Sequence, residues 1–350
     1  MLVLILAAAI WGFGIYFKVP VQARALMLAL LYIAVLFVQF ALPDGHPLRV
    51  SLGGSPGQWL VFGAMIAAIL GYRQILGRVR TRARAVEAER DQKEKPARTG
   101  PFSDVELERY ARHIVLREVG GVGQKRLKDA KVLVVGAGGL GSPVLLYLGA
   151  VGVGTLGVID DDVVSLSNLQ RQIVHTDDRG GTPKVFSAEA GIRALNPHVT
   201  IRPYNRRLTA DIAAELFADY DLIVDGSDTF ATREMVNAAA VLARKPLVAG
   251  AITQWEGQIT IYDPANGTPC LACLFPEAPD PNLAPSCAEA GVIGALPGIV
   301  GSVMALETIK EITGAGMTLR GTLLLWDGLD AEVRRVKIGR RPGCATCGHL

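Results

Sequence analysis

Apolar residues form three uninterrupted runs near the N-terminus. Residues 2–17, 25–42 and 59–72 contain no charged side chain. A helix needs about 20 residues to cross the hydrocarbon of a bilayer, so the middle run spans best and the outer two need their flanking residues. We predict a membrane region over residues 1–76 with two or three transmembrane helices. A removed signal peptide is the weaker interpretation, because no basic residue precedes the first run and no small-residue cleavage site directly follows it.

Basic residues between these runs indicate an orientation. Residues 18–24 contain two of them, residues 43–58 contain only Arg49, and arginines recur after residue 77. Basic loops stay in the cytoplasm, so the second and third runs should form a hairpin that leaves and re-enters it. We expect a multi-pass protein of the cytoplasmic membrane with its larger domain on the cytoplasmic side. Residues 77–100 are predicted to be a charged, partly helical juxtamembrane linker, which either contacts anionic lipid or is a solvated spacer.

From residue 101 onward, short apolar runs alternate with helical patterns. Ser103 and Glu106 form a capping-box pattern, which predicts a helix from Ser103 to about Val119. The β-branched run at residues 131–135 fits a strand buried on both faces. Further strands are predicted at residues 155–159, 199–204, 221–224 and 246–251, and helices at residues 183–195, 209–218 and 230–243. This rhythm predicts an α/β domain over residues 101–350, with a Rossmann-like, doubly wound, mainly parallel sheet.

Three later stretches have a different pattern. Residues 258–262, 322–326 and 332–338 are predicted to be antiparallel strands that extend the sheet. Residues 298–312 are apolar enough to suggest another membrane span, but Glu307 and Lys310 interrupt them. We therefore expect a buried helix that packs under the sheet or between subunits.

Composition and charge narrow the class of protein. Half of the residues are hydrophobic and 20% are charged, which excludes a disordered chain. The net charge of the whole chain is +3, but residues 101–350 hold 24 basic and 28 acidic side chains, a net charge of −4. A nucleic-acid binder would carry its basic excess on this folded domain, so nucleic acid is not an expected partner.

A glycine-rich loop follows the first predicted strand. Gly136, Gly138 and Gly141 fit the spacing G-x-G-x-x-G between a strand and a helix. Glycine allows the backbone to approach a phosphate, and a helix N-terminus supplies N–H donors. Asp160 ends the next strand, where a carboxylate can accept hydrogen bonds from ribose hydroxyls. The pattern indicates a nucleotide site, and a tight turn without a ligand is the alternative.

The next polar residues fit a triphosphate better than a nicotinamide. Asn168, Gln170 and Arg171 are expected in a loop at the carboxyl edge of the sheet, and Lys184 begins the following helix. Cationic side chains at these places suit a phosphate chain. Asp225 and Asp228 reach the same edge, and one of them could hold Mg²⁺. Each residue alone is more often a solvated loop residue, so the prediction rests on their joint placement.

With these residues the chain resembles the ubiquitin-activating-enzyme-like superfamily, specifically the bacterial molybdopterin-synthase and thiamine sulfur-carrier adenylyltransferases of the MoeB and ThiF type. The resemblance covers residues 102–350 and rests on RYARHIVL, GAGGLGSP, SLSNLQRQ, TPK, DGSD, WEGQIT, CLAC, SCAEAGV and CATC. It implies ATP-dependent adenylation of the C-terminal glycine of a small ubiquitin-like sulfur carrier ending in Gly-Gly. Pyrophosphate would be released.

The resemblance also assigns roles to individual residues. It places Gly139 in the phosphate loop, Asp160 at the ribose and Asp228 on Mg²⁺. It implies that Arg112 reaches the ATP of the other subunit, and therefore a homodimer. Nucleotide contacts are implied for Ser167, Asn168, Gln170, Arg171, Lys184 and Thr229. The family usually has asparagine where Thr229 stands, and a threonine hydroxyl can still donate one hydrogen bond.

Four of the five cysteines form two C-x₂-C pairs, Cys270 with Cys273 and Cys344 with Cys347. Four thiolates suit a tetrahedral structural Zn²⁺ site that holds the C-terminal tail to the domain, and unliganded or redox-active thiols are the alternative. Cys287 resembles the crossover-loop cysteine of the family, which is covalently linked to the carrier in some relatives and dispensable in others. A covalent role and a non-covalent loop position both remain open for it.

The sequence leaves three hypotheses about the function of the protein. The leading hypothesis is a membrane-anchored adenylyltransferase for the sulfur carrier of molybdenum cofactor biosynthesis, with the carrier of thiamine or another sulfur pathway as close alternatives. An NAD-binding oxidoreductase would leave Arg171, Lys184 and Asp228 without purpose. A non-catalytic membrane scaffold would bind a nucleotide or a carrier tail without turnover. Carrier-dependent release of pyrophosphate separates the three.

Overall fold

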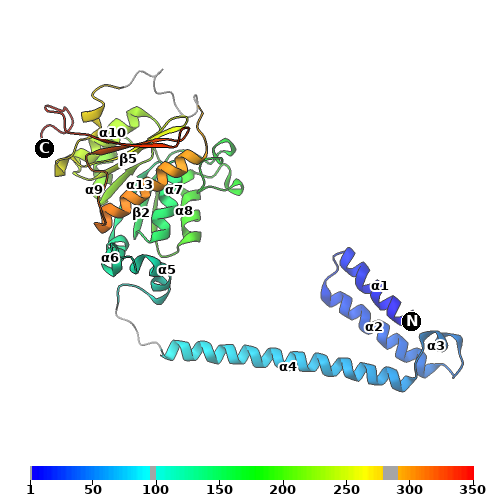
Figure 1. Ribbon diagram of the computed structural model, residues 1–350. Coiled ribbons are helices and arrows are strands. Elements are labelled where there is room, and N and C mark those ends of the chain that lie inside the picture. The colour runs from blue at the N-terminus through cyan, green and yellow to red at the C-terminus, as the bar shows by residue number, and fades with distance from the viewer. Residues whose placement is uncertain (1, 95–99, 279–290) are drawn as a thin grey trace. The chain divides into compact units, whose positions relative to one another are not determined.

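The structure, a computed structural model, describes residues 2–94, 100–278 and 291–350. The chain divides into two compact units, residues 1–99 and residues 100–350. Figure 1 shows the helices of the first unit in blue and cyan and the mixed α/β second unit in green to red. Each unit is described by itself.

The first unit is helical throughout its described part. It contains α1 (Leu2–Tyr16), α2 (Val21–Ala41), α3 (Pro47–Leu52) and α4 (Pro56–Glu94). By length and composition, two stretches could cross a membrane, Val21–Ala41 and Pro56–Leu76, whereas the apolar helix α1 is shorter. Apolar side chains such as Phe37, which is 72% exposed, point away from the unit. These findings agree with two of the three predicted spans, while the membrane topology stays a prediction.

A polar network closes the turn between α2 and α4. The Gln39 amide donates to the Gly53 carbonyl at 3.2 Å and accepts from Arg49 Nε at 3.1 Å. Arg49 also donates to the Leu42 carbonyl at 3.0 Å and pairs with Asp44 at 2.7 Å. Backbone carbonyls near helix ends lack intrahelical donors, and this arginine supplies one for Leu42. Beyond the turn, α4 continues to Glu94, so residues 77–94 of the predicted linker are helical.

The second unit begins with two short helices instead of the one that was predicted. The capping box is confirmed: Glu106 accepts from the Ser103 backbone at 2.9 Å, and Ser103 Oγ accepts from the Glu106 backbone at 3.3 Å. The expected end at Val119 is wrong, because α5 (Asp104–Ile114) stops earlier and α6 (Gly120–Asp129) follows. The chain forms turns between the two helices, where the Leu116 N–H donates to the His113 carbonyl at 3.1 Å and the Val119 N–H donates to the Leu116 carbonyl at 3.2 Å. Gly120, with φ +60°, then begins α6.

An eight-stranded sheet forms the centre of the second unit, in the order β3-β2-β1-β4-β5-β6-β7-β8. Five strands are mutually parallel: β1 (Lys131–Val135), β2 (Thr155–Ile159), β3 (Thr200–Tyr204), β4 (Leu222–Asp225) and β5 (Leu247–Ile252). Three strands extend the sheet in antiparallel fashion: β6 (Glu256–Tyr262), β7 (Thr322–Asp327) and β8 (Glu332–Lys337). The predicted fold class is confirmed, including the antiparallel extension.

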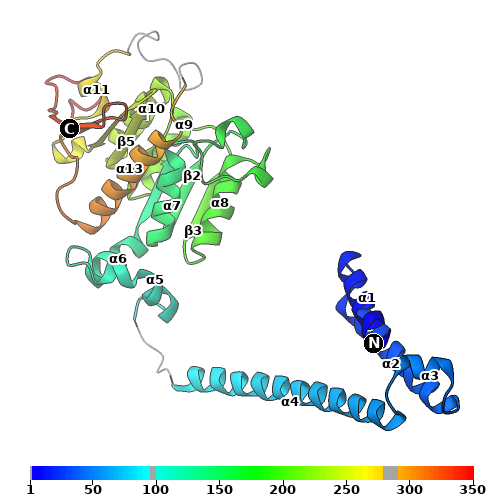
Figure 2. The same ribbon diagram turned by 45° about the vertical axis from the view of Figure 1, so that its right-hand side comes forward.

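Helices cover both faces of the parallel strands (Figures 1 and 2). One face carries α7 (Gly141–Val151), α8 (Lys184–Leu195) and α13 (Ala295–Thr313), and the other carries α9 (Ala210–Ala218) and α10 (Phe230–Leu242). Along β1, Val132 and Val134 belong to the first core, and Leu133 and Val135 belong to the second. This alternation explains the continuous apolar run, because both faces of β1 are buried.

Helix α13 confirms the expectation of a buried helix under the sheet. Leu296, Val300 and Met304 are at most 1% exposed and belong to the core on that face. Ile299 and Leu306, which lie seven residues apart, remain 37% and 54% exposed. Two helical turns separate these two residues, so they share the outward face of the helix.

Candidate active site

A cavity of about 390 Å³ opens at the carboxyl ends of the central strands. Strand order reverses here, because β1 lies between β2 on one side and β4 on the other. Ligands of open α/β sheets bind at such a switch point. Eight predicted site residues line the cavity, namely Gly136, Gly138, Gly139, Asp160, Arg171, Lys184, Asp228 and Thr229.

Two glycines of the loop are required by its geometry. Gly136 adopts φ +89°, and its N–H donates to the Ile159 carbonyl at 2.9 Å. A Cβ atom on Gly141 would lie 1.9 Å from the Gly136 carbonyl oxygen, closer than atoms can approach. Gly141 therefore serves close packing at the start of α7, and it is not among the residues that line the cavity. Pro143 lies in the first turn of this helix.

Asp160 joins the end of β2 to the glycine loop. One carboxylate oxygen accepts from the Ala137 N–H at 2.8 Å, and the other accepts from the Asp162 N–H at 2.8 Å. These two bonds fix the carboxylate at the cavity. Each oxygen keeps a second lone pair, which can accept a hydrogen bond from a ribose hydroxyl.

Two cations face the cavity from different elements. Arg171 follows the short turn Leu166–Asn168 and donates to Asn168 Oδ1 at 3.0 Å. Lys184 begins α8 and is only 4% exposed, with its ammonium 2.8 Å from a carboxylate oxygen of Asp162. A buried ammonium needs a counter-charge. The exposed Asp162 supplies it here, and a phosphate oxygen can supply it equally well.

The structure distinguishes the two aspartates of the DGSD segment. Asp228 lines the cavity, whereas Asp225 is only 2% exposed and lies behind it. Burial raises the pKa of Asp225, and the nearby Arg233 guanidinium opposes that shift. Asp225 Oδ1 accepts from the Ser227 N–H at 2.9 Å, so this residue shapes the loop. Of these two aspartates, Asp228 is therefore the one that lines the cavity, and its predicted contact with Mg²⁺ stays a prediction.

Thr229 performs a structural task as well. It is the N-cap of α10, and its hydroxyl accepts from the Thr232 N–H at 3.2 Å. An asparagine could cap the helix in the same way, so the substitution relative to the family pattern leaves this helix start intact.

Besides Gly141, four predicted residues within the described part of the chain lie away from the cavity lining. Ser167, Asn168 and Gln170 stand on the loop beside it, where Asn168 supports Arg171. Arg112 is exposed on α5 and does not line the cavity of its own chain. Their predicted contacts with a nucleotide stay predictions. Cys287 lies outside the described residues.

Sequence reasoning missed several lining residues. Gln172, Arg207, Ser227 and Arg233 also line the cavity. Gln172 Oε1 and Ser227 Oγ are buried and have no hydrogen-bond partner within the described part of the chain. Unsatisfied buried oxygens favour a polar ligand, so the cavity fits a nucleotide. Arg233 follows Thr229 by one helical turn, a spacing that could have indicated it.

The four cysteines of the two C-x₂-C pairs come together as predicted. Their sulfur atoms lie within 4.8 Å of one another, with neighbouring pairs at 3.5, 3.7 and 3.9 Å. Zinc–sulfur bonds of about 2.3 Å in a tetrahedron place sulfurs about 3.8 Å apart, so the cluster fits zinc. The Leu271 N–H beside Cys270 donates to Asn237 Oδ1 at 2.9 Å, which links this cluster to α10.

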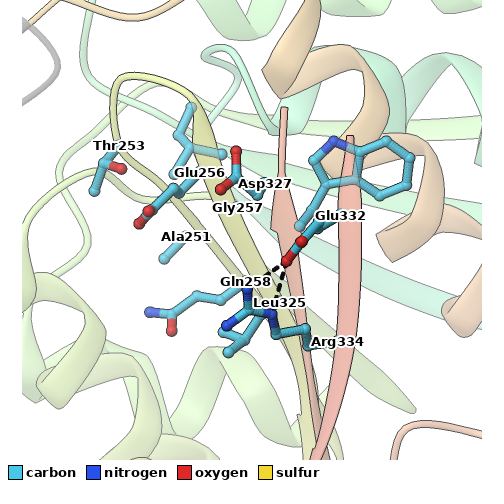
Figure 3. Close-up of a pocket in the computed structure, with 11 residues that line it drawn as sticks. Ala251, Thr253, Glu256, Gly257, Gln258, Leu325, Asp327, Glu332 and Arg334 are labelled. Carbon is cyan, nitrogen blue, oxygen red and sulfur yellow. Dashed lines mark hydrogen bonds and ion pairs between the residues drawn. The ribbon is translucent and has the colours of Figure 1, made fainter. Parts of the chain in front are cut away.

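A second cavity, of about 410 Å³, lies on the antiparallel half of the sheet. Figure 3 shows the side chains that line it, among them Glu332 and Arg334 of β8. Arg334 Nε donates a hydrogen bond to the Glu332 carboxylate at 3.0 Å. Trp326 on β7 also lines it, and the indole N–H is buried without a partner among the described residues. Ile252 at the end of β5 lines both cavities, which therefore adjoin.

Comparison with known proteins agrees with this arrangement. The sequence profile of the ThiF family matches residues 110–346, more than half of the chain. The chain belongs to the ThiF family. The matched residues include the glycine loop, Lys184, the DGSD segment and three of the four cysteines of the cluster, whereas Cys347 lies one residue beyond the match.

Several relatives of this ThiF family member are named adenylyltransferases. The chain is 51% identical over 247 residues to "Sulfur carrier protein adenylyltransferase" of Thermus thermophilus, with 69% of this chain and 91% of that protein covered. It is 49% identical to "SAMP-activating enzyme E1" of Haloferax volcanii, with 70% and 90% covered. It is 50% identical to "Probable adenylyltransferase/sulfurtransferase MoeZ" of Mycobacterium tuberculosis, with 71% and 64% covered.

Solved structures show the same fold at lower identity. A crystal structure of E. coli MccB with MccA-N7isoASN matches with a TM-score of 0.61 and 21% identity, covering 71% of this chain and 76% of that chain. A crystal structure of PaaA matches with a TM-score of 0.57 and 23% identity, covering 73% and 81%. At this identity the likeness concerns the fold alone.

Proposed function

We propose that this protein adenylates the C-terminal glycine carboxylate of a small ubiquitin-like sulfur-carrier protein at the expense of ATP, with release of pyrophosphate. The observation that carries the proposal is the cavity at the switch point, where Arg171 and Lys184 from separate elements face the glycine loop. The names of the relatives supply the reaction class and the kind of partner.

The chemistry that fits the cavity is transfer of AMP. A carboxylate oxygen of the carrier attacks the α-phosphorus of ATP, the bond to the bridging oxygen breaks, and that oxygen leaves on pyrophosphate. Negative charge grows on the leaving group, where Arg171 and Lys184 offset it. Position and charge supply the catalysis, so no general base is needed. Mg²⁺ held by Asp228 would neutralise phosphate charge.

The second cavity is where we place the tail of the carrier. It adjoins the nucleotide cavity at Ile252, so a peptide that crosses it can bring its terminal carboxylate to the phosphates. The indole N–H of Trp326, which has no partner among the described residues, can donate to a peptide carbonyl there. Two terminal glycines carry no side chain, so they would fit where the two cavities adjoin at Ile252.

We further propose that the protein acts as a homodimer. Ile299 and Leu306 form an exposed apolar face on α13, which a second subunit would cover. Arg112 is exposed on α5 and stands outside its own cavity, as expected of a residue that serves the other subunit. The four cysteines would hold a structural zinc ion.

We place the protein in the cytoplasmic membrane through α2 and the first part of α4. The support is their length, their apolar composition and the basic residues that follow Arg73. The larger unit would then face the cytoplasm, where lipid is its neighbour and the carrier its soluble partner. Protease accessibility of residues 100–350 in inside-out vesicles, but not in intact cells, tests this orientation.

Exchange of labelled pyrophosphate into ATP tests the reaction itself. Exchange is expected only with a β-grasp carrier ending in Gly-Gly, and a carrier that lacks the last glycine is the matched control. We expect the small subunit of molybdopterin synthase to support it better than the thiamine carrier. Hydride transfer to NAD⁺, or nucleotide binding without exchange, would replace the proposal with an oxidoreductase or a scaffold.

A further inference from the structure

One buried histidine connects the elements that surround the nucleotide cavity. His175 is 5% exposed and follows Arg171 by four residues. Its Nε2 lies 2.9 Å from the Ala137 carbonyl oxygen, and its Nδ1 lies 2.9 Å from Ser187 Oγ. Ala137 belongs to the glycine loop, and Ser187 lies one turn after Lys184 on α8.

These partners determine where the proton of the ring resides. A carbonyl oxygen only accepts, so Nε2 must carry the hydrogen. In a neutral ring Nδ1 is then an acceptor, and the Ser187 hydroxyl donates to it. Burial lowers the pKa of His175, and the Lys184 ammonium lowers it further against the opposing effects of the Ala137 hydrogen bond and Asp160. The neutral ring is therefore the form that suits this site.

The Ala137 segment is held from two sides. Its N–H donates to Asp160 at 2.8 Å, and its carbonyl accepts from His175. The flanking glycines each have one backbone bond, from the Gly136 N–H to the Ile159 carbonyl and from the Ser142 N–H to the Gly138 carbonyl, both at 2.9 Å. Glycine itself tolerates many conformations, so the bonds to Ala137 add to the restraint of this loop. A loop whose N–H groups must face phosphates binds more tightly when it is fixed in that form beforehand.

We propose that His175 is a positioning residue that holds the glycine loop in its phosphate-binding form through the Ala137 carbonyl, with Ser187 selecting the required tautomer. The proposal deepens the proposed function, since it concerns the same ATP site. It assigns His175 no contact with ATP and no proton transfer.

Two substitutions separate this role from general support of the core. In His175→Gln the amide nitrogen replaces Nε2, so it can still donate to the Ala137 carbonyl. In His175→Asn the amide nitrogen replaces Nδ1, so the bond to the loop is lost. Equilibrium binding of a non-hydrolysable ATP analogue with Mg²⁺ to the full chain in detergent micelles is the readout, together with the melting temperature of each variant.

We expect His175→Gln to bind the analogue within about threefold of the native chain, and His175→Asn to bind it about tenfold more weakly, the loss typical of one hydrogen bond. Asn196→Ala is the structural control. Asn196 is buried and donates to the Tyr110 hydroxyl and the Gly149 carbonyl. Its replacement should therefore lower the melting temperature without weakening the binding of the analogue.

The outcomes are distinct. Equal binding by both His175 variants would overturn the proposal. The proposal would also be overturned if the affinity for the analogue fell in proportion to the melting temperature in all variants, Asn196→Ala included. That result would show that the effect is a loss of stability. If the native chain does not bind the analogue, the proposed function is wrong, and the positioning role is wrong with it.

Discussion

The two cavities of the sheet differ in the way their strands meet, and so in what they can bind. Parallel strands end together at the first cavity, where a helix N-terminus, glycines and four basic side chains face one space. The second cavity lies on the face of antiparallel strands and is lined by side chains such as Glu256, Asp327 and Trp326. The first arrangement suits a polyphosphate and the second an extended peptide. Under the proposed function, one sheet would therefore offer separate sites to two substrates.

Removal of the buried ammonium should have the largest effect. In Lys184→Ala we expect carrier-dependent pyrophosphate exchange to fall by about 10³-fold, because a cation at the transferred phosphate is lost. Exposed Lys125, which pairs with Asp129, gives the control Lys125→Ala with near-native exchange. Near-native exchange in Lys184→Ala would break the assignment of the first cavity to the phosphates.

Neutralisation of the metal-facing carboxylate should have the next largest effect. Asp228→Asn is expected to lower the exchange rate by about 10²-fold at limiting Mg²⁺, since an amide oxygen carries no charge to hold the ion. A titration with Mg²⁺ should show partial recovery. Glu234→Gln, on the exposed side of α10, is the matched control and should follow the native titration. A native metal dependence in Asp228→Asn would contradict the role.

A change in the second cavity should affect one substrate only. Trp326→Phe keeps a ring but removes the indole N–H, so we expect the KM for the carrier to rise about tenfold while the affinity for ATP stays unchanged. Steady-state kinetics with each substrate varied in turn measures both. A variant that loses ATP affinity instead would show that the two cavities are not separate sites.

The smallest effect on chemistry is expected from the cysteine cluster. In Cys344→Ser we expect loss of bound zinc and a melting temperature lower by roughly 5 °C or more, because the metal stabilises the fold. The ATP affinity should remain near that of the native chain below the lowered transition. Metal analysis and calorimetry on the same sample test this. Weaker ATP binding without a lower melting temperature would contradict a purely structural role. It would indicate that the cluster affects the active site through the Leu271–Asn237 hydrogen bond.

Local patterns were sufficient for the main elements. The predicted strand at β1 is confirmed, and the glycine loop lies between that strand and α7, as its spacing predicts. Nucleotide binding by the loop stays a prediction. The first helix was predicted too long, because Val115, Leu116 and Val119 are apolar while the backbone after Ile114 already forms turns. The choice between Asp225 and Asp228 as the carboxylate facing the cavity could not be made from two residues at one strand end.

Residue type and short spacing were enough to predict the fold class, the glycine loop, the cysteine pairs and two of the four basic residues at the cavity, Arg171 and Lys184. Only the tertiary structure decided that Asp225 turns inward, that Asp162 partners Lys184, and that His175 joins Ala137 to Ser187. These facts depend on contacts between segments far apart in the chain or on the side of a loop that packing buries. Burial and long-range pairing are properties of the assembled core, and no local pattern encodes them.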